Sequence, residues 1–464
     1  MKWIFQDDLI GRFQRQLRVS FGAFYFLSGK AKKDSKSDHS FSKEEAKMKS
    51  LKRMMLVALF VILTGSISGA QGIPQASNPE EVGLSSAQLN RLGAVTQAHI
   101  DSGLLPGAVM LVARQGKIAY LKSMGFRDRA SSSPMQTDAI FRIYSMTKPI
   151  VSVALMMLVE EGRLQIDHPV AKYIPEMGQM KVGVEKTDAN GKPSLELVNP
   201  KREMTIQDLL RHTSGLIYGG RGKSQVNAAY QAAKIGDRKE SNQEFVAKVA
   251  KMPLRFSPGT QWEYGVSTDV LGRVVEVVSG KKLGEFLSEG VLRPLGMADT
   301  AFFVPQEKLG RAAQPWQRPG GPPMTPRFDV AEVPRFESGG GGLTSTISDY
   351  LRFTLMLQRN GEFQGKRFLG KKTVEFMTAD HVGNVPGRPP GLGFGLGFEV
   401  RKTTGQAYLP GTAGEYGWAG NAGTLFWIDP KEDLIAIYMI QVSDGDRIML
   451  RNQFRTMVQA SIIR

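Results

Sequence analysis

The sequence predicts a mixed α/β protein, in which an antiparallel sheet flanked by helices is joined to an all-α subdomain. The apolar runs at residues 108–113 and 117–121 are separated by a short polar turn, as in a β-hairpin. A second pair, residues 423–428 and 434–441, flanks the turn Asp-Pro-Lys-Glu-Asp. Residues 167–335 between them lack strand patterns. Hairpins near both ends therefore predict a sheet closed by the N- and C-terminal segments, with a helical insertion.

The first 70 residues look unrelated to this fold. Residues 1–47 are polar and basic without a sustained period, and we interpret them as an upstream extension that results from a start codon assigned too early. Residues 48–70 combine a positive start, an apolar stretch of about ten residues and a small-residue end at Ala70, which is typical of a secretory signal peptide. The apolar stretch is shorter than the about 20 residues that a permanent membrane span needs. We therefore expect a periplasmic or secreted protein.

The remaining elements follow in order within one domain, residues 71–464. A serine-capped helical pattern covers residues 85–102, and the first hairpin follows it. The longest apolar run of the mature protein, residues 150–159, predicts a buried helix. A helix over residues 269–278 ends at a glycine, and a final helix begins at about residue 446. The expected sheet part is about 78–166 and 336–464, and the helical insertion is about 167–335.

Composition excludes several kinds of site. The chain has no cysteine, which rules out disulfides, thiolate zinc sites and a thiol nucleophile. Its five histidines are scattered without metal-ligand spacing, so we expect neither a metal nor another cofactor. The net charge is +16, but residues 1–53 hold 13 basic and 6 acidic residues, and the rest is spread along the chain. No basic cluster is interleaved with aromatic residues, so a nucleic-acid partner is not expected.

The strongest candidate for chemistry is the pair Ser145 and Lys148. A spacing of three places both side chains on one face of a first helical turn, where Pro149 is tolerated. The same Ser-x-x-Lys spacing occurs at Ser40 and at Ser279, but only Ser145 precedes a long apolar helix. Ser145 is therefore expected at a rigid helix start, where the simpler role of a helix cap is the alternative.

A serine nucleophile needs a base nearby. The Gly-x-Ser-x-Gly motif of many hydrolases is absent from the chain, so Lys148 has to be considered. A lysine buried at the helix start can lose its proton, or it can stay charged and stabilise a tyrosinate. The residues alone do not decide between these two roles.

Five motifs in order carry a resemblance to a known family. They are Ser145-Met-Thr-Lys148-Pro149-Ile150, His212-Thr-Ser-Gly-Leu216, Trp262-Glu-Tyr264, Gly339-Gly-Gly-Gly-Leu343 and Trp418-Ala-Gly420. Together they resemble the class C β-lactamase-like serine hydrolases, which have the penicillin-binding-protein fold, and most of all the family VIII carboxylesterases. The similarity spans the chain from about residue 80 to the C-terminal helix. It implies a β-lactamase/transpeptidase-like fold without a metal or cofactor.

The resemblance also implies roles for individual residues. Ser145 would be the acylated nucleophile, Lys148 the partner that receives or stabilises its proton, and Tyr264 the general base. Trp418 and Gly420 would lie on the strand that walls the cleft, and the backbone N–H groups of Ser145 and Asn421 would form the oxyanion hole. Rigid donors aimed at an oxyanion commonly contribute ~3 kcal/mol each.

Two departures from the β-lactamases narrow the expected substrate. Val266 stands where they have an asparagine that holds the substrate amide, and Trp418 stands where they have a lysine that pairs with the antibiotic carboxylate. An aromatic wall without that cation favours apolar substrates. We therefore expect a serine hydrolase of small esters or amides, working through a Ser145 acyl-enzyme.

Alternatives to this function and to single residue roles stay open at this point. The protein can instead act on β-lactams or on cell-wall peptides as a D-alanyl-D-alanine carboxypeptidase, or it can be a non-catalytic protein that binds an envelope ligand. His212 fits a structural role at a helix end better than a catalytic one. Gly339 to Gly342 form either a flexible linker or a loop close to the substrate. The sequence does not indicate the oligomeric state.

The signal-peptide interpretation makes one direct prediction. The exported protein should begin at Gln71, because cleavage is expected after Ala70. N-terminal sequencing of the protein recovered outside the cytoplasm checks this. Residues upstream of Gln71 in the exported protein would contradict it.

Overall fold

A computed structural model of the chain describes residues 72–187, 191, 193–318, 320–321, 326–442 and 445–464. The chain divides into two compact units, residues 1–72 and 73–464. The predicted extension 1–47 and signal peptide 48–70 lie outside the described residues. Within the described ranges, no helix is both long enough and apolar enough to cross a membrane.

The centre of the second unit is an eight-stranded antiparallel sheet, as the two predicted hairpins indicated. The strands lie in the order β10 (Leu392–Phe394), β11 (Glu399–Arg401), β12 (Tyr416–Ala419), β13 (Leu425–Asp429), β14 (Leu434–Met439), β1 (Gly107–Arg114), β2 (Lys117–Asp128) and β3 (Ser133–Pro134). Strand β1 pairs with β14, with Leu111 opposite Ile437. The N-terminal and C-terminal hairpins therefore meet in the middle of one sheet.

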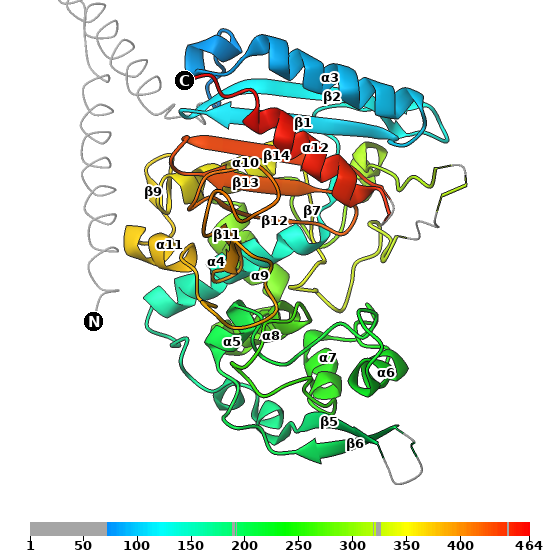
Figure 1. Ribbon diagram of the computed structural model, residues 1–464, viewed down its shortest axis with the longest axis vertical. Helices are drawn as coiled ribbons and strands as arrows, with labels where there is room; N and C mark the ends of the chain where they lie inside the picture. Colours follow the sequence, from blue (N-terminus) through cyan, green and yellow to red (C-terminus); the bar gives the residue numbers. More distant parts are fainter. Residues whose placement is uncertain (1–71, 188–190, 192, 319, 322–325, 443–444) are drawn as a thin grey trace, which may run out of the picture. The chain divides into compact units, whose positions relative to one another are not determined.

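Helices cover both faces of this sheet, because successive residues of β1 point to opposite sides and are apolar on both. Ala108, Met110 and Val112 pack in one cluster with residues of α3 (Ser86–Asp101) and α12 (Arg447–Gln459). Val109 and Leu111 belong to a second, larger cluster with α4 (Thr147–Glu160) and α10 (Ile347–Gln358). Figure 1 shows α3 and α12 together on one side of the sheet, away from the helical part.

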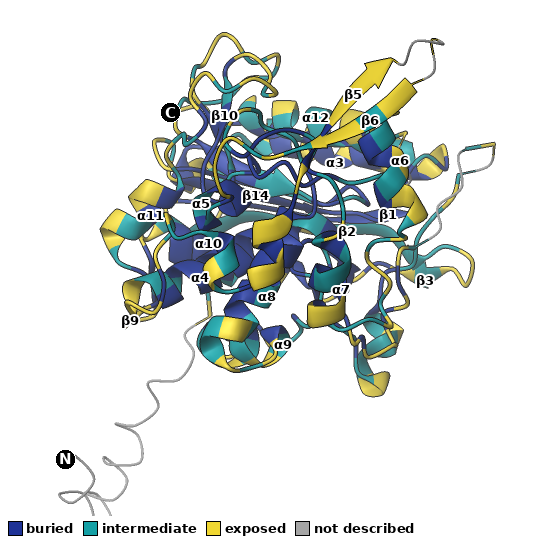
Figure 2. Ribbon diagram, turned by 90° about the horizontal axis from the view of Figure 1, so that it is seen from below, coloured by how far each residue is buried: buried dark blue, intermediate teal, exposed yellow. Residues whose placement is uncertain are grey.

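The insertion is mostly helical, as expected. Its elements are η3 (Val170–Lys172), η4 (Pro175–Gln179), α5 (Ile206–Leu210), α6 (Gln225–Ala232), α7 (Asn242–Val249), α8 (Ser267–Ser279), α9 (Leu283–Leu287), η5 (Ser288–Leu292) and η6 (Gln306–Arg311). It also contains a hairpin that the sequence did not indicate, β5 (Val182–Thr187) and β6 (Pro193–Val198). Most residues of this hairpin are exposed, so they carry no apolar periodicity (Figure 2).

Short elements complete the fold. They are η1 (Pro79–Val82), β4 (Phe141–Arg142), η2 (Tyr144–Met146), β7 (Thr344–Ser345), β8 (Glu362–Phe363), β9 (Lys366–Arg367) and α11 (Lys371–Met377). Strand β4 pairs with β7, and the 3₁₀ turn η2 leads directly into α4. Residues 147–156 of α4 are all buried, which confirms the predicted core helix. Ser145 therefore lies on a turn fixed between the sheet and the helical part.

Candidate active site

A strained backbone turn presents Ser145. Its neighbour Tyr144 has a φ of 43°, a left-handed conformation that costs a non-glycine residue roughly 1 kcal/mol or more. The Tyr144 ring packs edge-on against Phe328, with the ring centres 5.7 Å apart. On the other side of the turn, the Tyr350 hydroxyl donates a hydrogen bond of 2.9 Å to the Met146 carbonyl. Surrounding contacts thus hold the turn, and no side chain caps η2 or α4.

Lys148 lies one turn further on, with only 1% of its surface exposed. Its Nζ donates to the carbonyl oxygen of Gly340 at 2.6 Å and to the hydroxyl of Tyr218 at 3.1 Å. The same nitrogen lies 4.6 Å from the centre of the Tyr264 ring. No carboxylate in the described part of the chain forms an ion pair with Lys148. Its nearest partners are therefore phenol groups and a carbonyl.

The glycine loop expected near the substrate holds one of these partners in place. Asp269 on α8 accepts hydrogen bonds from the Ser338 hydroxyl at 2.5 Å and from the Gly340 N–H at 2.9 Å. A Cβ atom on Gly340 would overlap the Asp269 carboxyl group, so only glycine fits there. The carbonyl of Gly340 then points to Lys148. This loop is a packed part of the site and not a linker.

Charge keeps Lys148 protonated. Burial alone would lower the pKa of Lys148. The negative charge that Tyr218, Tyr264 and Asp269 can carry outweighs burial, and it raises the pKa of the lysine above its ordinary value. Of the two roles that the sequence left open, the geometry favours a charged lysine beside a tyrosinate.

Two tyrosines compete for this ammonium group, and their surroundings differ. Burial would raise the pKa of Tyr264, but the charge of Lys148, with hydrogen bonds from Ser145 and Trp418, lowers it below the ordinary value. The indole Nε1 of Trp418 lies 3.4 Å from the Tyr264 hydroxyl. Burial raises the pKa of Tyr218 more than the charge of Lys148 lowers it, and a charged Tyr264 raises it further. Tyr264 is therefore the phenol that ionises first.

Sequence reasoning did not single out Tyr218, although its hydroxyl contacts Lys148 directly. The residue follows the His212-Thr-Ser-Gly-Leu216 motif by two positions on an irregular loop. Nothing in its local sequence distinguishes it from an ordinary aromatic residue. Only its tertiary contacts show its place in the site: the hydrogen bond from Lys148 and the packing of its ring against Tyr264, with ring centres 5.4 Å apart.

His212 is buried behind these tyrosines. Its ring packs against Tyr264 and Phe394, with ring centres 4.9 and 5.4 Å away. Burial and the positive charge of Lys148 hold the pKa of His212 well below its ordinary value, so the ring is neutral. Its Nδ1 lies 3.5 Å from the Gly265 N–H, next to Tyr264. This geometry fits the structural role favoured by the sequence.

The last of the five motifs, Trp418-Ala-Gly420, forms the wall of the site on the side of the sheet. A Cβ atom on Gly420, at the end of β12, would overlap the carbonyl oxygen of Ile143, two residues before Ser145. The Asn421 carbonyl and side-chain oxygens accept hydrogen bonds from Arg447 at 2.7 and 2.8 Å. Among the described residues, the backbone N–H groups of Ser145 and Asn421 donate to no protein acceptor. Both remain available to a ligand.

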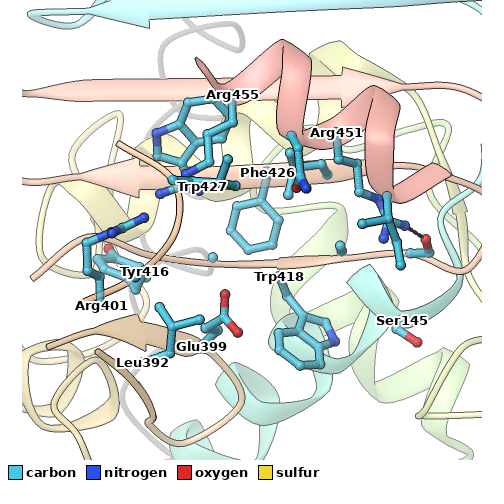
Figure 3. A pocket seen from close by; sticks show the side chains of 18 of the residues that line it. Ser145, Leu392, Glu399, Arg401, Tyr416, Trp418, Phe426, Trp427, Arg451 and Arg455 are labelled. Atoms are coloured by element: carbon cyan, nitrogen blue, oxygen red, sulfur yellow. Dashed lines mark hydrogen bonds between the residues drawn. The ribbon is translucent and has the colours of Figure 1, made fainter. Parts of the chain in front are cut away.

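Two cavities meet at Ser145. The first, of about 430 Å³, runs along β12 and has aromatic and aliphatic walls that include Trp262, Trp418 and Leu392. Figure 3 shows Trp418 between Ser145 and the far end of this cavity at Arg401 and Tyr416. The second, of about 650 Å³, opens towards the helical part. Its lining includes Tyr144, Tyr218, Gly340, Gly341, Phe328 and Arg238.

Comparison with known proteins identifies the family. The Beta-lactamase family model matches residues 92–456. The chain belongs to the beta-lactamase family. This beta-lactamase family member is 32% identical to esterase EstB of Burkholderia gladioli over 76% of this chain and 90% of EstB. It is 30% identical to a lovastatin esterase of Penicillium rubens over 77% of this chain and 95% of that protein.

The fold of this beta-lactamase family member is also shared with solved structures. EstCE1, a hydrolase with promiscuous acyltransferase activity, superposes with a TM-score of 0.68 at 25% identity. The match covers 80% of this chain and 98% of EstCE1. These matches confirm the predicted fold class, and they show a serine hydrolase of the carboxylesterase-like kind.

The tight fit at Gly420 makes a prediction. Gly420→Ala places a methyl group against the Ile143 carbonyl and the Thr424 hydroxyl, so β12 must shift away from Ser145. We expect a loss of about 1–3 kcal/mol in unfolding free energy and a fall in ester hydrolysis of roughly tenfold or more. Gly405→Ala is the control, since nothing lies within 4 Å of its Cβ position. Equal stability and activity of the two variants would contradict this account.

Proposed function

We propose that this protein hydrolyses small carboxylic esters through an acyl-enzyme on Ser145. The observation that carries the proposal is the buried Lys148 ammonium beside Tyr264, at the place where two cavities reach the serine. A charged lysine lowers the pKa of Tyr264, so the phenolate is the base that a serine nucleophile requires. Lys148 acts here through its charge and does not itself receive the proton.

The reaction proceeds in two steps. The Tyr264 phenolate accepts the Ser145 hydroxyl proton while Oγ bonds to the ester carbonyl carbon. Tyr264 then returns this proton to the departing alkoxide as the bond between the carbonyl carbon and the alcohol oxygen breaks. In the second step, water attacks the acyl-enzyme and gives its proton to Tyr264, and the released Ser145 oxygen recovers a proton from the same phenol. The carboxylic acid leaves, and the enzyme returns to its starting state.

The oxyanion of each tetrahedral intermediate needs fixed donors. We assign this role to the backbone N–H groups of Ser145 and Asn421, which lie on two rigid elements and have no protein acceptor among the described residues. These two elements approach so closely that a Cβ atom at position 420 would overlap the Ile143 carbonyl oxygen. Preorganised donors of this kind commonly contribute ~3 kcal/mol each to transition-state stabilisation.

Esters fit this site better than β-lactams or cell-wall peptides. Val266 has an apolar side chain that is 4% exposed within the core, and such a side chain offers no amide to a substrate. The indole of Trp418 lies against Tyr264 and Phe394, where a charged side chain would pair with an antibiotic carboxylate. The relatives named as esterases support the same choice. We also propose that the protein is exported, on the basis of the signal-peptide pattern at residues 48–70.

The direct test compares two substrates with one enzyme. Residues 71–464 should hydrolyse p-nitrophenyl butyrate and leave nitrocefin essentially untouched, because the amide and cation that hold a β-lactam are absent. Ser145→Ala should lower the ester rate by at least about a thousandfold. Nitrocefin turnover comparable to ester turnover would favour a β-lactamase. Full ester activity in Ser145→Ala would refute the acyl-enzyme.

The pH dependence tests the roles of Lys148 and Tyr264. Activity should rise with pH as Tyr264 loses its proton, with a midpoint below the ordinary tyrosine pKa of about 10. Lys148→Gln removes the charge that lowers the pKa of Tyr264, so the midpoint should rise by about one pH unit or more. Lys148→Arg keeps the charge, and Lys366→Gln serves as an exposed control. An unchanged midpoint in Lys148→Gln would refute this assignment.

A further inference from the structure

The second cavity carries an excess of positive charge that the reaction does not use. Apart from Arg447, whose guanidinium bonds to Asn421, its lining includes four basic side chains from three segments of the chain: Arg221, Lys234, Arg238 and Arg327. Among the described residues of the same lining, the only carboxyl group is that of Asp269, which is buried and bonded to Ser338 and Gly340. The surface that a ligand meets in this cavity is therefore cationic.

The first cavity, which Arg221 also borders, differs because its lining contains two carboxylates, each paired with arginine. In the first cavity, the carboxylate of Glu399 pairs with Arg388, and that of Glu415 pairs with Arg401 and Arg455. Within the described ranges, none of the four basic groups of the second cavity forms an ion pair with a carboxylate. Unpaired cations lining a concave surface concentrate anions there.

Packing fixes the position of Arg238. Its guanidinium lies 4.3 Å from the centre of the Phe328 ring, and Nη2 donates to the Phe302 carbonyl at 3.2 Å. Burial lowers the pKa of Arg238 overall, although the nearby Glu332 and Asp329 act to raise it, and neither carboxylate forms an ion pair with Arg238. An arginine held in this way is ordered before a ligand binds, so little side-chain entropy is lost on binding.

Arg221 connects this charge to the reaction centre. Its guanidinium lies 5.0 Å from the centre of the Tyr264 ring and 5.8 Å from that of Tyr218, and it borders both cavities. The chain thus lacks a cation at Trp418 on the sheet side, but it supplies several on the helical side. An anionic group in the second cavity would meet them close to the scissile bond.

We propose that the preferred substrate is an ester that carries a carboxylate, and that this carboxylate lies in the second cavity while the apolar part of the substrate lies along Trp418. The inference rests on the proposed esterase function and names its substrate class. Guanidinium and ammonium groups bind carboxylates by charge-assisted hydrogen bonds. Because the two cavities meet at Ser145, an ester bound there has its acyl and alcohol parts in different cavities.

Two matched pairs of esters test the proposal. The first pair places the charge on the acyl part: the mono-p-nitrophenyl ester of hexanedioic acid against p-nitrophenyl hexanoate. The second pair places it on the leaving group: 4-(butanoyloxy)benzoate against 4-(butanoyloxy)benzamide. We expect the enzyme to favour the anionic member of one pair in kcat/KM, after correction for hydroxide-catalysed rates. Added salt should weaken this preference.

Variants then connect the preference to the cavity. Lys234→Gln/Arg238→Gln should lower the ratio of anionic to neutral kcat/KM about tenfold. Lys234→Gln/Arg327→Gln repeats the test with two exposed residues, whose replacement does not disturb packing. Lys251→Gln, exposed and outside both cavities, should keep the ratio.

The outcomes separate the two proposals. Neutral members favoured in both pairs, or a ratio that both double variants leave unchanged, would overturn the carboxylate site while the esterase function stands. Failure of the unmodified enzyme to cleave any of the four esters would overturn the esterase function, and this inference with it. The ratio is independent of the folded fraction, because both substrates report on the same enzyme sample.

Discussion

The burial of a charged lysine on the first turn of α4 is the constraint around which this site is built. Lys148 has no carboxylate partner within the described ranges, so its charge is balanced by polarisable and ionisable neighbours. This arrangement lowers the pKa of Tyr264, and in the proposed mechanism it provides a base for Ser145 without a catalytic histidine. His212, which lies against the same tyrosine, is kept neutral by burial and by the same charge.

Close approaches between backbone segments hold these side chains in fixed positions relative to one another. Gly340 brings its carbonyl to Lys148 because only glycine fits against Asp269, and Gly420 lets β12 reach the turn before Ser145. The left-handed Tyr144 is part of the same turn. The sheet contributes the contact at Gly420, the insertion the contact between Asp269 and Gly340, and the start of the core helix the turn at Tyr144. A small shift in any one of them changes the distance between Ser145 and Tyr264, its proposed base.

The sequence predicted the framework well and the site only in part. Both hairpins and the core helix were visible because apolar periodicity reports burial directly. The β5–β6 hairpin was missed because it is exposed. Ser145 and Lys148 were singled out by spacing, but Tyr264 needed the family resemblance. Tyr218 and the unpaired Arg238 depend on tertiary contacts between distant segments, and local sequence holds no signal for these.

Direct titration of Tyr264 tests the central claim most simply. The ultraviolet absorbance of tyrosinate, recorded against pH for the unmodified protein and for Tyr264→Phe, isolates this one phenol as a difference. The account predicts an ionisation below the ordinary tyrosine pKa of about 10 that disappears in Tyr264→Phe and moves upward in Lys148→Gln. A Tyr264 that ionises at or above the ordinary value, whether or not Lys148 is charged, would contradict it.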